Sequence, residues 1–213
     1  PHHRCRPHHH LILLLLIISS SSPSYHLTTS GRQTLYLVLK ARHTVFQARQ
    51  LSPHGSNPSG VDLSEQHTIA VVEKTSARLE LRLAALFHDI GKPATRSFEH
   101  GGVTFRHHEA VGAKITKKRM RELEFDRQMV KDVAELVRLS GRFKGYGDGW
   151  SDAAVRRYAR EAGHLLGELN ELVRCDCTTR NRSKEARLHR LIDELEERIV
   201  ELARADAEAA ERP

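Results

Sequence analysis

Five side chains with the chemistry of metal ligands are spread over the sequence: His67, His88, Asp89, His108 and Asp176. Helical spacing places four of them on stripes that are otherwise apolar, and Asp89 adjoins one of those four. A cap or a core hydrogen bond could explain one such residue. A buried carboxylate without a partner is costly, so convergence on a shared cation explains the whole set better. We therefore predict that these five residues bind one metal ion.

The predicted ligand set suits a particular group of ions and a particular reaction. Imidazole and carboxylate together favour divalent cations such as Mn²⁺, Ni²⁺, Co²⁺, Fe²⁺ or Mg²⁺. Such an ion lowers the pKa of bound water enough to supply hydroxide at neutral pH, and it polarises phosphoryl oxygens. His88 and Asp89 are therefore predicted to be catalytic as well. Lys92 could hold a phosphate as a point charge, or it could be a solvated lysine at a helix end.

Helices must position these side chains, and the first two are predicted from local signals. Asp62-Leu63-Ser64-Glu65 has the form of a capping box, so a helix should run from there to about Ser76. A second helix should cover residues 79–89. Gly91 is expected to end it in a left-handed conformation, and Pro93 to prevent it from resuming.

The later part of the chain continues the helical pattern. Residues 97–105 alternate around two glycines, which predicts a short β-hairpin or an ordered loop. The glycine-rich segment 141–150 is expected to be a loop. Further helices are predicted from about 107, at 127–139, at 151–162, from about 164, and from about 183 onward. The result is an all-α fold, with a helical domain at 61–182 and a C-terminal amphipathic helix at 183–213.

Residues 1–60 have a different composition from the rest of the chain. They contain six Arg or Lys and no Asp or Glu, whereas the remainder is nearly balanced in charge. Their apolar run of eight residues, 11–18, is far shorter than the ~20 needed to span a bilayer, so no membrane association is expected. We predict a disordered or non-native extension. Its clustered histidines could bind metal adventitiously: His2, His3, His8, His9 and His10.

The three cysteines are too few for a disulfide framework or a four-cysteine zinc site. This cysteine usage fits a reducing cytoplasm, which is the expected location.

The segment His88-Asp89-Ile90-Gly91-Lys92, preceded by Leu-Ala-Ala-Leu-Phe, resembles the signature of the HD superfamily of metal-dependent phosphohydrolases. The family pattern is an early histidine, the His-Asp doublet and a distant aspartate, here matched by His67, the doublet and Asp176. His108 matches an additional histidine that is common in this branch. The resemblance implies an HD-domain helical bundle with divalent-metal phosphohydrolase activity.

A closer resemblance covers residues 67–213. LRLAALFHDIGKPATRSF, HHEAVGAKITKKRMREL, RFKGYGDGWSDAAVRRY and RCDCTTRN look like the HD region of bacterial, especially actinobacterial, CCA-adding tRNA nucleotidyltransferases and their poly(A) polymerase relatives. This implies a role in tRNA 3′-end processing. The Gly-Gly-x-Val-Arg-Asp and Asp-x-Asp segments of that family's catalytic head do not occur in this chain. We therefore expect a fragment that lacks the head and has no nucleotidyltransferase activity alone. Ser140 stands where relatives commonly have a histidine.

Two basic clusters extend the nucleic-acid hypothesis. One comprises Lys114, Lys117, Lys118 and Arg119, and the other Arg156, Arg157 and Arg160. Each could bind RNA phosphates or form a solvated helix face. Tyr146 and Trp150 could stack on a base or anchor their loop to the core.

The expected partner is tRNA or a phosphate-containing nucleotide, and the last helix could form a homodimer. Two alternative functions stay open, a non-catalytic RNA-binding remnant and a stand-alone HD nucleotide phosphohydrolase.

Overall fold

The structure of the chain, a computed structural model, describes residues 63–99, 102–179 and 181–211. The predictions made for residues 1–60, and for Asp62 of the capping box, lie outside these ranges. The chain divides into two compact units between Arg138 and Leu139. The boundary predicted between residues 182 and 183 stays a prediction.

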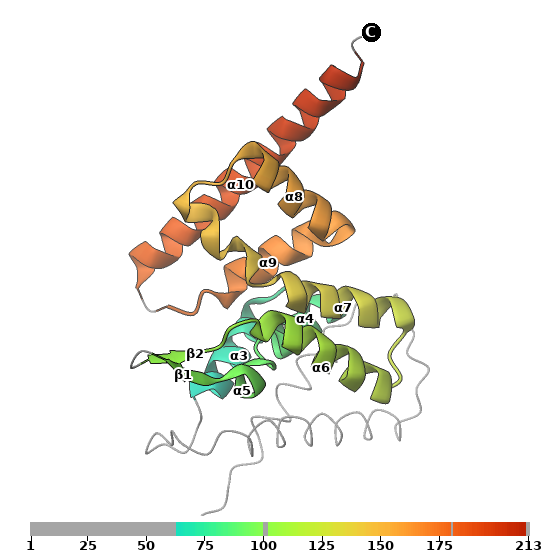
Figure 1. Cartoon of the computed structure of the whole chain (residues 1–213), viewed down its shortest axis with the longest axis vertical. Coiled ribbons are helices and arrows are strands. Elements are labelled where there is room, and N and C mark those ends of the chain that lie inside the picture. The colour runs from blue at the N-terminus through green and yellow to red at the C-terminus, as the bar shows by residue number, and fades with distance from the viewer. Residues whose placement is uncertain (1–62, 100–101, 180, 212–213) are drawn as a thin grey trace, which may run out of the picture. The chain divides into compact units, whose positions relative to one another are not determined.

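Helices dominate the first unit, as the all-α prediction requires (Figure 1). They are α3 (Leu63–Lys74), α4 (Leu79–Phe87), α5 (Lys92–Thr95), α6 (His108–Glu122) and α7 (Arg127–Leu139). The described part of α3 begins one residue after Asp62, and α7 has the predicted bounds. Helix α3 packs on α4, and α5 packs on α6. Their shared core is aliphatic and includes Val71, Leu81, Met120, Val133 and Leu136, all fully buried.

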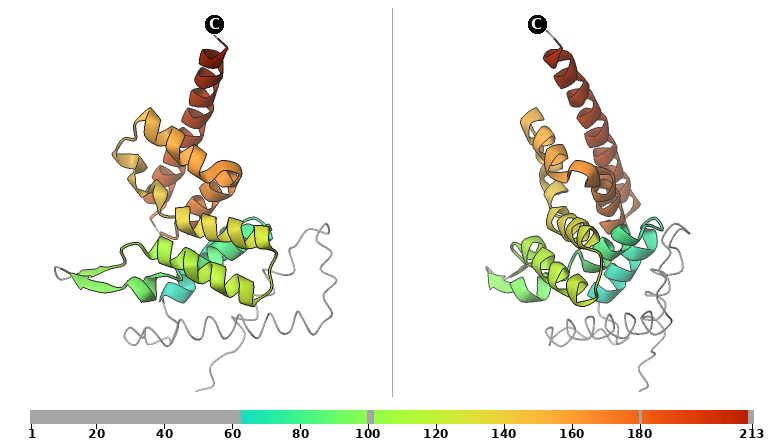
Figure 2. Two further views of the ribbon diagram at one scale, coloured as in Figure 1. Left: turned by 45° about the vertical axis from the view of Figure 1, so that its right-hand side comes forward. Right: turned by 90° about the vertical axis from the view of Figure 1, so that its right-hand side faces the viewer.

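Residues 97–99 and 102–104 form two paired strands, which decides for the hairpin between the two structures predicted there. Strand β1 (Ser97–Glu99) pairs antiparallel with β2 (Gly102–Thr104), with Phe98 opposite Val103. The hairpin extends away from the helices of its unit (Figure 2). The outward side chain of Phe98 is 74% exposed, and the guanidinium of Arg96 lies over its ring.

Two predictions around the second helix are wrong. Gly91 has φ −81° and ψ −17°, a right-handed conformation rather than a left-handed one. Pro93 does not stop the chain from becoming helical, because it lies in the first turn of α5. Proline suits that position, since its fixed φ is helical and its missing N–H would be unpaired there anyway.

The predicted loop at 141–150 is also wrong, because Arg142–Asp148 forms the 3₁₀ helix η1. The reason lies in Phe143 and Tyr146, which are both buried and three residues apart. A 3₁₀ helix has three residues per turn, so it places both rings on one side. The rings stack with centroids 5.4 Å apart.

The second unit consists of η1, α8 (Asp152–Ala162), η2 (Gly163–Leu165), α9 (Leu166–Asp176) and α10 (Arg182–Ala210). Helix α10 packs on both α8 and α9, and its C-terminal half extends beyond them (Figure 2). The buried side chains of α10, which was predicted as an amphipathic helix, are Ile192 and Leu195. Ser151 caps α8 through Ala154 N, and Asn181 caps α10.

Among the helices of the described ranges, none has both the length and the hydropathy that a bilayer span requires.

Candidate metal centre

Helices α3 and α4 bring three of the five predicted ligands together. His67 lies in α3, while His88 and Asp89 directly follow α4. One ligand atom from each residue lies within 4.8 Å of the other two. Among the described residues, this is the group of His, Cys, Asp and Glu side chains with the spacing of a metal site. The predicted meeting of His67 with the His-Asp doublet is therefore present in the structure.

The distances between these atoms match a shared cation. His67 Nε2 and His88 Nε2 lie 3.1 Å apart. Asp89 Oδ2 lies 3.7 Å from His67 Nε2 and 3.4 Å from His88 Nε2. Two nitrogens bound side by side to an ion at about 2.1 Å each are about 3 Å apart. The two imidazoles thus already have the separation of neighbouring ligands.

The end of α4 fixes the orientation of His88. This residue is the C-cap of the helix and is 3% exposed. Its Nδ1 donates a hydrogen bond of 2.7 Å to the carbonyl of Ala85, one of the last carbonyls of α4. In the neutral ring, Nε2 then has no proton and presents a lone pair toward His67. Such a backbone bond behind a histidine is the usual support of a metal ligand.

His108 has the same arrangement at the start of α6. Its Nδ1 donates to the carbonyl of Phe105 at 2.8 Å, and its buried Nε2 lies 3.7 Å from Asp89 Oδ1. The preceding His107 is left-handed, with φ 60°, so the chain turns sharply as it enters the helix. His108 therefore faces the Oδ1 atom of Asp89, whereas His67 and His88 face Oδ2, and His108 lies next to the three-residue group rather than within it.

Asp89 is ionised by its surroundings. Burial is the largest single influence and raises its pKa. The hydrogen bonds and charges of His88 and Lys92 together outweigh burial and lower the pKa of Asp89 to about 2. Lys92 Nζ lies 2.5 Å from Asp89 Oδ2 and about one-third of its side chain is exposed. The ammonium group for which phosphate binding and simple solvation were both considered is thus adjacent to the candidate ligand carboxylate.

Three supporting groups were not predicted from the sequence: the carbonyls of Ala85 and Phe105, and the carboxylate of Glu109. Glu109 Oε2 lies 3.4 Å from His108 Nδ1. Both carbonyls belong to the residue three positions before the histidine that they orient. That spacing is visible in the sequence, but it applies to every helical histidine and carries no functional signal alone.

Asp176 is the last residue of α9 and is partly exposed. It belongs to the second compact unit, as does Ser140. Their participation in the metal site stays a prediction.

The two basic clusters differ in how many of their charges are engaged. On α6, Lys114, Lys117 and Lys118 are exposed, whereas Arg119 pairs with Glu122 at 3.0 Å. On α8, Arg156 binds both carboxylate oxygens of Asp206.

Arg157 and Arg160, also on α8, are exposed and have no ion pair or hydrogen bond with any residue that the structure describes. RNA binding by either cluster stays a prediction.

The comparisons with known proteins agree with this architecture. The family model described as HD domain matches residues 63–203. A CC-adding tRNA nucleotidyltransferase of Thermus thermophilus is 45% identical over 80 residues, which are 34% of this chain and 18% of the relative. An A-adding tRNA nucleotidyltransferase of Deinococcus radiodurans is 33% identical over 108 residues, 50% of this chain and 24% of the relative. The matches thus span a quarter or less of those relatives.

The class of protein follows from the helical fold, the His-Asp doublet and the family match. The chain belongs to the HD domain family, whose members are generally metal-dependent hydrolases. The resemblance to the HD family and to tRNA nucleotidyltransferases is confirmed.

Proposed function

We propose that this chain is a metal-dependent phosphohydrolase domain that cleaves phosphate esters of nucleotides, such as 2′,3′-cyclic phosphates and 2′-nucleotides. The carrying observation is the convergence of His67 Nε2, His88 Nε2 and Asp89 Oδ2 within 4.8 Å. His88 also has the second feature of a metal ligand, because its imidazole is buried and its other ring nitrogen donates to the carbonyl of Ala85.

The donor set fits a divalent ion of the type Mn²⁺, Ni²⁺, Co²⁺ or Mg²⁺. His67, His88 and Asp89 would hold it, with His108 and Asp176 as the further proposed ligands. When bound, the ion supplies a hydroxide at neutral pH and polarises a phosphoryl oxygen.

The chain's own groups prepare the rest of the site. The carbonyl of Ala85 accepts a hydrogen bond from His88 Nδ1 and so orients the ring, which leaves Nε2 as the atom that would bind the ion. The hydrogen bonds and charges of His88 and Lys92 keep Asp89 ionised. Lys92 also places a positive charge beside it, where the anionic phosphate of a substrate would be attracted. His108 Nε2 faces the second oxygen of Asp89 and restrains the carboxylate.

The link to RNA rests on the relatives, which are named for action on tRNA. We propose tRNA or a nucleotide derived from RNA as the substrate, in the cytoplasm. The nucleotidyl transfer for which the two relatives are named is not proposed for this chain.

The experiment is hydrolysis of a generic phosphodiester, bis(p-nitrophenyl) phosphate, by the full chain with Mn²⁺ or Ni²⁺. We expect turnover that a chelator removes, and that H88A and D89A each reduce by about 100-fold or more. H164A replaces an exposed histidine outside the cluster and should leave the rate unchanged. Turnover that persists in both ligand variants, or that is absent with every metal, would refute the proposal.

A second candidate function is metal-independent RNA binding, favoured by the exposed lysines of α6. Lys114, Lys117 and Lys118 are three and four residues apart, so they share one face of the helix. The full chain should then bind tRNA at low salt in the presence of chelator. Replacing the three lysines by glutamine should reduce the slope of log affinity against log salt by roughly 2–3. An unchanged slope would remove this candidate.

A further inference from the structure

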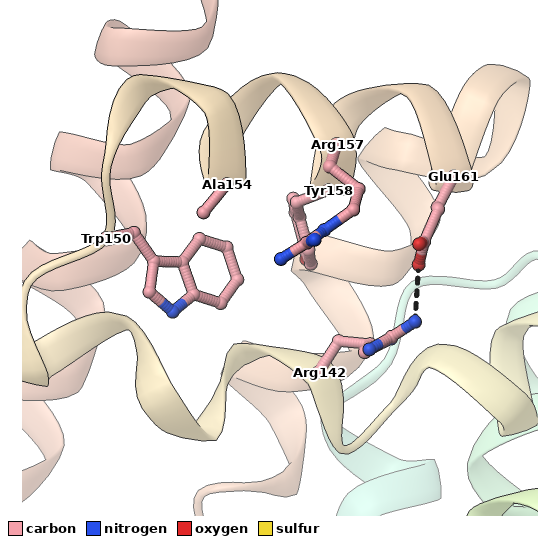
Figure 3. A pocket seen from close by; sticks show the side chains of 6 residues that line it. All are labelled: Arg142, Trp150, Ala154, Arg157, Tyr158 and Glu161. Carbon is pink, nitrogen blue, oxygen red and sulfur yellow. Dashed lines mark hydrogen bonds and ion pairs between the residues drawn. The ribbon is translucent and has the colours of Figure 1, made fainter.

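The second unit contains a cavity that the metal chemistry does not use. It has a volume of about 260 Å³ and lies between η1 and α8 (Figure 3). Its lining residues are Arg142, Trp150, Ala154, Arg157, Tyr158 and Glu161. An indole, a phenol ring and two guanidinium groups thus face one small space.

The aromatic side of this cavity is held in place by the core. The Trp150 ring lies 5.3 Å from Tyr146 and 5.4 Å from Tyr158, measured between centroids. Both tyrosines are buried, and Tyr158 donates a 2.8 Å hydrogen bond to Asn170, which in turn binds Glu196. Trp150 itself is only half-buried. A rigid aromatic surface of this kind accepts a stacked base without a large ordering cost.

The charged side of the cavity has an uncommitted cation. Arg157 lines the cavity and makes no hydrogen bond or ion pair with the part of the chain that the structure describes. Arg160 lies one helical turn further along α8 and is equally uncommitted. Arg142 binds Glu161 at 2.8 Å across the opening (Figure 3). The two arginines that line the cavity outnumber its one carboxylate, so the cavity attracts an anion.

We propose that this cavity binds one nucleotide through its base and its phosphate. The base stacks on Trp150, and the phosphate is held by the planar guanidinium of Arg157, with Arg142 beside it. The Glu161 carboxylate is placed to accept a hydrogen bond from an amino group of the base. The volume falls below the roughly 300–1,000 Å³ of pockets for drug-sized ligands, which matches one base rather than a larger molecule.

This proposal does not depend on the metal centre, since its residues all lie between Arg142 and Glu161. The same chemistry could come from a free nucleotide or from one unstacked position in an RNA strand, and the two sources are distinguished by experiment.

The sequence offers a direct probe, because Trp150 is the chain's single tryptophan. Its fluorescence in the full chain would be titrated with adenosine monophosphate and, separately, with a short single-stranded oligoadenylate, both in the presence of chelator. Stacking on the indole predicts saturable quenching that weakens as salt is raised. Quenching by both ligands assigns the cavity to free nucleotides as well. Quenching by the oligonucleotide alone assigns it to an RNA strand.

Variants connect the signal to the cavity. R157Q should weaken binding roughly tenfold, because a charge-assisted contact is lost. R187Q removes the same charge from an exposed arginine on α10 that does not line the cavity, and should bind as the parent chain does. W150A should abolish binding. Because this variant lacks the fluorescent residue, its binding would be measured by calorimetry, after circular dichroism has shown that its helices are intact.

H88A should leave the quenching unchanged, so failure of the phosphohydrolase proposal would not affect this test. No quenching by either ligand, or equal affinity of R157Q and the parent chain, would overturn the nucleotide cavity.

Discussion

Gly91 packs directly against the backbone carbonyl of His108, so closely that a Cβ atom on Gly91 would collide with that oxygen. The same Cβ would lie 2.6 Å from the amide nitrogen of Gly112. The segment after the His-Asp doublet is therefore pressed against the first turns of α6. This contact keeps Asp89 within 3.7 Å of His108.

The first prediction concerns this backbone contact. Replacing Gly91 by alanine should lower the free energy of unfolding by about 1–3 kcal/mol or more, because neither backbone group that meets the new methyl can move alone. Urea unfolding measures the change. Gly167 is the matched control, since a Cβ there meets nothing within 4 Å and its helical site favours alanine. If G91A and G167A had the same free energy of unfolding, the close contact of Gly91 with α6 would not be needed for stability.

The second prediction concerns His108, which adjoins the three-residue group without being part of it. H108A should weaken Mn²⁺ binding by about 10–100-fold, because Asp89 loses a restraining neighbour and the site a further proposed ligand. H88A should abolish binding at the same site. Calorimetric titration of both variants distinguishes the roles. Equal affinity of H108A and the parent chain would remove His108 from the site.

The third prediction is a pH dependence of stability. Asp126 Oδ1 accepts hydrogen bonds from the amides of Gln128 and Met129 at the start of α7, and these bonds lower its pKa below 3.8. A group whose pKa is lower in the folded chain stabilises that chain above the unfolded pKa. The contribution is lost as pH falls through the folded value.

Asparagine caps a helix through the same bonds but does not titrate. The stability advantage of the parent chain over D126N should therefore be largest at neutral pH. It should shrink as the pH falls toward and below 3.8. Denaturant unfolding at several pH values tests this, and a difference independent of pH would contradict it.

The sequence could locate the candidate metal centre because helix periodicity decides which side chains share a face. His67 lies three and four residues before Ala70 and Val71, and His88 lies three and four residues after Ala85 and Ala84. Helical spacing therefore predicts that both histidines point inward with these apolar residues. Both do, and their Nε2 atoms meet at 3.1 Å. The conformation of Gly91 was predicted wrongly because a glycine can be required either for a left-handed backbone or for close packing. The dihedral angles of Gly91 are ordinary, and it is required because a side chain there would collide with α6. Local sequence does not reveal this contact, because α6 lies further along the chain.

The contacts of the arginines on α8 could not be predicted from the sequence pattern either. Arg156 and Arg157 are neighbours of one type, yet one binds Asp206 of α10 and the other lines a cavity. Fifty positions separate Arg156 from its partner, so no local spacing could indicate the pair. The cavity also depends on η1, and the glycine-rich segment that forms η1 was predicted to be a loop.

The most direct test of the metal centre is calorimetric titration of the chain with Mn²⁺. The five histidines at positions 2, 3, 8, 9 and 10 would be replaced by alanine in every sample, so that they bind no ion. The parent background should take up one ion per chain at the centre, and H67A, H88A and D89A should each lose that uptake. No uptake by the parent background, or uptake unchanged in H88A and D89A, would contradict a metal site at the His-Asp doublet.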